Sequence, residues 1–124
     1  MIFAVTERGQ TMGTNYYAVR KRPTTDRPIH IGKSSIGWRF LFEEQNDMFN
    51  EPPVVWHTYD QLYEWLYKNT VETDNYVILN EYDDEISFYE FIKLIEEKQM
   101  EKNPDDFQYA KNINGYRFAD SDFL

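Results

Sequence analysis

The chain has 124 residues, of which 41% are hydrophobic and 18% aromatic, and a formal net charge of −9 at pH 7. This length allows one domain with a single core, and because the chain has no cysteine it has neither a disulfide framework nor a thiolate zinc site. No apolar run approaches the roughly 20 residues that span a bilayer, and residues 1–5 lack the basic flank of a signal peptide. We expect a cytoplasmic protein that does not contact a membrane.

The first eleven residues differ from the rest of the chain. Residues 1–11 carry no strong capping or strand-pairing signal, and we expect a leader there that is disordered and dispensable. Residues 12–124 are expected to form a single small α+β domain, with an antiparallel sheet and two helices packed on it.

Three strands are predicted in the N-terminal part of this domain. Alternating side chains predict strands over Asn15–Arg20, Ile29–Lys33 and Gly37–Glu43. A prolyl loop, residues 21–28, follows the first strand, and residues 34–37 form the turn of a hairpin between the other two. On the third strand, alternation places three aromatic residues on one face: Trp38, Phe40 and Phe42.

A helix is predicted after residues 45–53, which have the composition of a polar loop. Thr58 and Gln61 fit a capping box, so the helix begins after Thr58. Its apolar stripe follows the i, i+3, i+4, i+7 pattern and consists of Tyr59, Leu62, Tyr63 and Leu66.

The C-terminal part of the chain contains a second capping box and a second apolar stripe. A short buried strand is predicted over Val77–Leu79, and Ser87 with Glu90 forms a second capping box for a helix that runs to about Gln99. The stripe of this helix consists of Phe88, Phe91, Ile92 and Ile95. Residues 115–118 are predicted to form a last strand.

The predicted hairpin carries most of the unusual side-chain chemistry. Its Gly-Lys-Ser string resembles the end of a phosphate-binding P-loop, but the upstream glycine is missing and a strand follows where a helix should begin. A hairpin tip nevertheless offers backbone N–H groups, hydroxyls and cations, which together suit an anion. The residues predicted to bind a ligand are His30, Lys33, Ser34, Ser35, Trp38 and Arg39.

Each of these residues has a structural alternative. Ser34 and Ser35 also suit a solvated turn in which they bond their own backbone. Trp38 either stacks on a base or fills the core, and His30 either acts as an acid, base or phosphate partner or is bonded within the sheet.

The sequence supports neither a metal site nor an enzyme. The acidic stretch from Glu81 to Glu85 lacks the glycine and the alternating spacing of a calcium loop, so we expect no metal and no cofactor. No Ser/His/Asp or Cys/His arrangement of recognisable spacing is present. A small phosphoesterase that uses His30 or His57 remains one alternative.

Charge and aromatic content favour a binding role. Residues 1–42 carry seven Lys or Arg against two acidic residues, a net charge of +5, and residues 43–124 carry six against twenty, a net charge of −14. The basic part suits a phosphate-bearing ligand, and the acidic part repels nucleic acid and favours basic protein surfaces. Ten Tyr, nine Phe and three Trp exceed what one small core absorbs, so some are expected at a surface. Simple solubilisation and half-exposed strand tyrosines are the alternatives.

Four segments carry a resemblance to a known group: residues 12–17, 29–40, 85–91 and 115–118. They resemble small uncharacterised tailed-bacteriophage proteins with a His-Ile-Gly-Lys-Ser-Ser-x-Gly-Trp motif. Relatives commonly begin at the equivalent of Met12. They often have a Cys-x-x-Cys pair before the motif, which looks like half a zinc ribbon, where this chain has residues 23–28 without cysteine. The resemblance therefore brings no metal site to this protein.

The resemblance implies a phage accessory protein that acts by binding in the host cytoplasm and antagonises a host defence or another host process. Its partner would be either a phosphorylated, nucleotide-like small molecule held at the hairpin tip or a host protein that it occludes. An acidic DNA mimic, which docks on a nucleic-acid-binding host protein without itself binding nucleic acid, is the alternative. The oligomeric state is left open.

Overall fold

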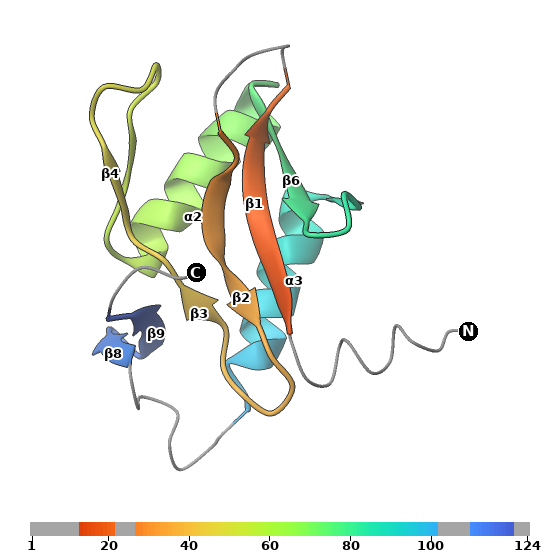
Figure 1. Ribbon diagram of the computed structural model, residues 1–124, viewed down its shortest axis with the longest axis vertical. Coiled ribbons are helices and arrows are strands. Elements are labelled where there is room, and N and C mark those ends of the chain that lie inside the picture. Colours follow the sequence, from red (N-terminus) through yellow and green to blue (C-terminus); the bar gives the residue numbers. More distant parts are fainter. Residues whose placement is uncertain (1–12, 22–26, 102–109, 121–124) are drawn as a thin grey trace.

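The structure is a computed structural model that describes residues 13–21, 27–101 and 110–120. These residues form a small α+β domain with a mostly antiparallel sheet and two helices (Figure 1), which confirms the expected fold class. The leader predicted over residues 1–11 lies outside the described residues, so it stays a prediction.

Seven strands form the main sheet in the order β7-β6-β1-β2-β3-β9-β8. Their bounds in chain order are β1 (Thr14–Arg20), β2 (Ile29–Ser34), β3 (Leu41–Phe42), β6 (Tyr76–Asn80), β7 (Glu85–Ile86), β8 (Ala110–Ile113) and β9 (Tyr116–Ala119). Neighbours pair antiparallel except β3 and β9, which are parallel, with Leu41 opposite Arg117 and Phe42 opposite Phe118. This parallel pair brings the C-terminal hairpin β8–β9 beside the segment that follows β2.

A second sheet contains two strands, β4 (Gln45–Asp47) and β5 (Val54–Trp56). The prediction of a polar loop over residues 45–53 is therefore wrong for its first three residues. Their polar side chains give no hydrophobic alternation, and β4 forms because it pairs with β5, whose Val54 and Trp56 are buried.

Both predicted helix starts are confirmed. The Thr58 hydroxyl accepts the backbone N–H of Gln61 at 3.2 Å, and α2 (Tyr59–Tyr67) follows it and continues into a π-helical turn, η1 (Lys68–Glu72). The Gln61 side chain accepts from the N–H of His57, one residue earlier than a capping box requires. At α3 (Phe88–Lys98) the box of Ser87 and Glu90 is complete.

The core lies between the main sheet and the two helices. Both predicted stripes are buried except at Tyr63, which is 39% exposed. Rings from sheet and helix interlock, because Phe40 lies 4.7 Å from Phe42 and 5.6 Å from Phe91, and Phe42 stacks on Phe118 at 5.1 Å between centroids. Aromatic packing thus fixes where β3 and the loop before it lie on α3.

The predicted third strand is mostly a loop. Only Leu41–Phe42 pair with β2, and Ser35–Phe40 form a connection with a turn that the Trp38 N–H closes by donating to the carbonyl oxygen of Ser35 at 3.2 Å. Gly37 has φ +85°, a left-handed conformation that cannot continue a strand, and Phe40 leaves the ladder to enter the core. We call residues 35–40 the basic loop, for the cations described below.

Candidate functional site

The basic loop joins β2 to β3 and lies beside the C-terminal end of α3 (Figure 1). Four residues of the predicted ligand set, Ser34, Ser35, Trp38 and Arg39, lie in this loop or at its start, and Lys33 precedes them on β2. The structure therefore brings five of the six predicted residues into one segment, and it places His30 elsewhere.

One side of the loop is held by α3 and the start of β1. The Lys98 ammonium donates to the carbonyl oxygen of Ser35 at 2.5 Å, and burial lowers the pKa of Lys98 below its ordinary value, against the opposing effect of Glu101. A Cβ at Gly13 would lie 2.6 Å from Ser35 Oγ and 3.0 Å from Lys33 Cε. Both side chains thus cover Gly13 closely, which fixes the start of the loop.

The other side is held by β9 and the end of α3. Arg117 Nη1 donates to the carbonyl oxygen of Arg39 at 3.0 Å, and the Arg117 guanidinium lies 4.9 Å from the centre of the Trp38 ring. Arg39 Nε donates in turn to the carbonyl oxygen of Glu101 at 3.3 Å. Trp38 is half-buried at the loop and is not one of the buried core residues.

Four partly buried cations consequently surround one loop of an acidic chain: Lys33, Arg39, Lys98 and Arg117. A hydrogen bond to a main-chain carbonyl orients each of the last three. We define the basic loop site as these four residues with Ser34, Ser35 and Trp38. It combines cations, hydroxyls and an aromatic face, which together match a phosphate attached to a planar group.

His30 lies near the other end of β2 and is held on both ring nitrogens. Its Nδ1 lies 2.5 Å from a carboxylate oxygen of Glu43, and its Nε2 lies 2.9 Å from Oδ1 of Asn15. The Asn15 amide donates to the carboxylate of Glu81 at 3.0 Å, so a chain of polar contacts runs from the residue after β6, through β1 and β2, to the segment after β3. These contacts are consistent with the alternative in which His30 is bonded within the sheet.

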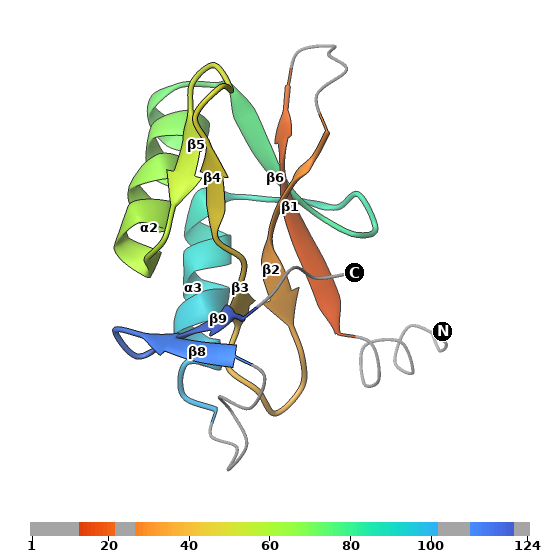
Figure 2. The same cartoon turned by 60° about the vertical axis from the view of Figure 1, so that its left-hand side comes forward.

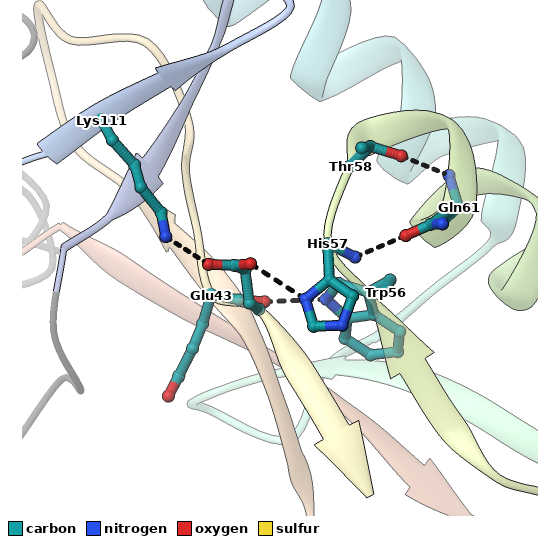
Figure 3. A network of polar contacts seen from close by, with 7 residues as sticks. Glu43, Trp56, His57, Thr58, Gln61 and Lys111 are labelled. Carbon is teal, nitrogen blue, oxygen red and sulfur yellow. Dashed lines mark hydrogen bonds and ion pairs between the residues drawn. The ribbon is translucent and has the colours of Figure 1, made fainter. Parts of the chain in front are cut away.

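His57 belongs to a second polar network (Figure 3). Its Nδ1 lies 2.9 Å from one oxygen of Glu44, and the Lys111 ammonium lies 2.5 Å from the other. The hydrogen bond from Lys111, and after it that from His57, holds the pKa of Glu44 below its ordinary value. This network ties the residue before the N-cap of α2 to β8.

Two further observations concern metal sites and membrane-spanning helices. Within residues 13–21, 27–101 and 110–120, no group of three or more His, Cys, Asp or Glu gathers as metal ligands would. In the same part of the chain, none of the helices has the length and apolar character that a membrane crossing requires.

No protein-family model, curated protein or solved structure matches the chain.

Proposed function

We propose that the protein acts by binding, and that the basic loop site holds a phosphorylated, nucleotide-like ligand. The observation that carries this proposal is the convergence of four cations, from β2, the loop, α3 and β9, on one loop of a chain whose net charge is −9. Partial burial strengthens each interaction with an anion, because the local dielectric is lower than that of water.

The chemistry of the site suits sequestration better than turnover. Charge-assisted hydrogen bonds contribute about 1.5–3 kcal/mol each, so three of them to a phosphate contribute about 4.5–9 kcal/mol, and micromolar binding corresponds to about 8 kcal/mol. Trp38 adds a flat aromatic surface beside the cations, which favours a ligand with a base over inorganic phosphate. Both described histidines are already engaged with carboxylates outside the loop, which favours a binding protein over the phosphoesterase alternative.

In the phage setting that the sequence resemblance implies, such a protein would remove a nucleotide-like signal or metabolite from the host. It would thereby antagonise a host defence or another host process. The DNA-mimic alternative predicts a salt-sensitive complex with a basic protein and no heat with nucleotides. A phosphoesterase predicts turnover of the nucleotide.

Isothermal titration calorimetry with mono-, di- and cyclic nucleotides tests the proposal. The double variant Lys33→Ala/Arg39→Ala should bind about 100-fold or more weakly than wild type, because it lacks two charge-assisted partners of the phosphate. Lys68→Ala/Lys93→Ala is the matched control, since it removes the same charge from two exposed positions on η1 and α3.

The control should bind within about threefold of wild type, because distant exposed charges are largely screened by salt. No heat from any nucleotide with wild-type protein would refute the proposal. An equal loss in the control pair would also refute it, because net charge and not the site would then explain binding.

A further inference from the structure

The connection between β4 and β5 exposes two large apolar side chains. Phe49 is 97% exposed and Met48 is 62% exposed, and the connection extends beyond the two strands at the upper left of Figure 1. An aromatic side chain in a folded protein normally buries about 150–250 Å² of its surface, and it is rarely left wholly exposed to water. Figure 2 shows the same hairpin beside α2, with its tip at the top of the view.

This exposure is not the result of a loosely held loop. The Arg20 guanidinium, from β1, donates to Asn50 Oδ1 and to the carbonyl oxygen of Glu51, both at 2.8 Å. The Trp65 indole N–H, from α2, donates to the carbonyl oxygen of Pro53 at 2.9 Å. Two other elements of the fold therefore anchor the connection just after its exposed residues.

The tip itself has a defined turn. The Asp47 carboxylate accepts the backbone N–H of Phe49 at 3.1 Å, which closes a short Asx turn around Met48. A backbone held in this way loses little conformational entropy when it binds, and preorganisation of this kind increases affinity. Single exposed aromatic residues of this type dominate the binding energy of many interfaces.

The charges at the tip indicate the chemistry of its partner. Asp47 and Glu51, both exposed, flank the apolar pair, and residues 45–53 contain no Lys or Arg of their own. Two arginines reach this connection from other segments: Arg20 is half-buried and bonds Asn50 and the carbonyl oxygen of Glu51, and Arg27 lines a hollow with Asp47. Two carboxylates beside an apolar tip favour a surface with basic groups around an apolar centre. They disfavour an anionic lipid surface, which would repel them.

We propose that Met48 and Phe49 form a docking tip that inserts into an apolar pocket of another protein, with Asp47 and Glu51 facing Lys or Arg at the rim of that pocket. The tip lies at the opposite end of the molecule from the basic loop (Figure 1), so one chain can hold a small ligand and a protein at once. This surface is therefore separate from the proposed ligand site.

A photo-cross-linking experiment tests the docking tip. The full chain carries p-benzoylphenylalanine at position 49 or, as a control, at position 100, where Met100 is 82% exposed on another face. Each protein is irradiated in a bacterial lysate, and the cross-linked residue is mapped by mass spectrometry. We expect one protein that is cross-linked from position 49 and not from position 100, within an apolar pocket bordered by Lys or Arg.

The purified pair then provides the quantitative test. Phe49→Ser should weaken the complex at least tenfold, and Met100→Ser should change it less than twofold. Asp47→Asn with Glu51→Gln should weaken the complex and reduce its dependence on salt, while the amide introduced at position 47 keeps the oxygen that accepts the turn hydrogen bond. Phe49→Ser should have the same Tm and the same affinity for nucleotides as wild type. These two measurements separate this test from that of the basic loop site.

Three results would contradict the proposal that residues 48 and 49 form a docking tip. The first is the absence of a cross-link specific to position 49, or a diffuse set of cross-linked proteins. The second is a specific cross-link to a second copy of the chain or to lipid. The third is a purified complex whose affinity does not change in Phe49→Ser.

Discussion

Substitution of Gly32 by alanine tests the packing that positions the basic loop. Gly32 is buried in β2, opposite Tyr16 of β1 and Phe42 of β3. A methyl group at this position would lie 2.3 Å from the carbonyl oxygen of Leu41 and 2.4 Å from Cε2 of Phe40. The closest atom belongs to the backbone, so no change of side-chain rotamer relieves the overlap.

The size of the effect follows from these two contacts. Overpacking a core typically costs about 1–3 kcal/mol, and here β3 and the Phe40 ring have to move together, so we expect about 3 kcal/mol or more. For a domain of this size, that loss lowers Tm by roughly 10 °C or more. Because Phe40 ends the basic loop, the same shift should also weaken nucleotide binding.

Gly37→Ala is the matched control. No atom lies within 4 Å of a Cβ at Gly37, and its φ of +85° leaves only the cost of a left-handed alanine, about 1–2 kcal/mol. Urea unfolding followed by fluorescence measures both variants on one scale. If Gly32→Ala is as stable as Gly37→Ala, the placement of Phe40 and Leu41 over β2 is wrong.

Other variants test single contacts. Thr58→Ala and Ser87→Ala should each lose about 0.5–2 kcal/mol in urea unfolding, because each removes a helix N-cap, and curves that superimpose on wild type would contradict the two helix starts. Glu44 has a lowered pKa in the folded protein, so its stabilisation is complete above the ordinary Glu pKa of about 4.3 and is lost as the pH falls through the lower folded value. Glu44→Gln should therefore be less stable than wild type at pH 5.5 and approach it near pH 3, and a difference that does not depend on pH would refute the role of Lys111. Trp38→Ala should cost about 1–2 kcal/mol, below the 3–5 kcal/mol of a fully buried aromatic residue, because the indole is only half-buried against Arg117.

The features predicted correctly are those that depend on residues close together in the sequence. Ser87 and Glu90 are three positions apart and cap α3 in the way that their spacing indicates. Asn114–Gly115 is a further local signal, which sequence reasoning overlooked. Both residues have positive φ, 56° and 90°, and they form the two-residue turn between β8 and β9.

The basic loop site was predicted only in part, because half of its cations come from distant segments. Lys33 and Arg39 are close in sequence and were predicted together from their place on the expected hairpin. Lys98 and Arg117 were counted with the acidic part of the chain. The parallel pairing of β3 with β9 and the packing of α3 bring them to the loop, and no local pattern encodes such contacts.

The most direct test of the ligand site uses the three indole N–H signals of the protein. In a ¹⁵N-resolved spectrum, Trp56 and Trp65 are internal references, because their indole groups donate to the carbonyl oxygens of Glu43 and Pro53. Titration with the nucleotide that gives the largest calorimetric heat should shift the Trp38 signal and leave those of Trp56 and Trp65 in place. If the Trp38 signal does not move at saturation, or if only another indole moves, the ligand does not bind at the basic loop and the account is wrong.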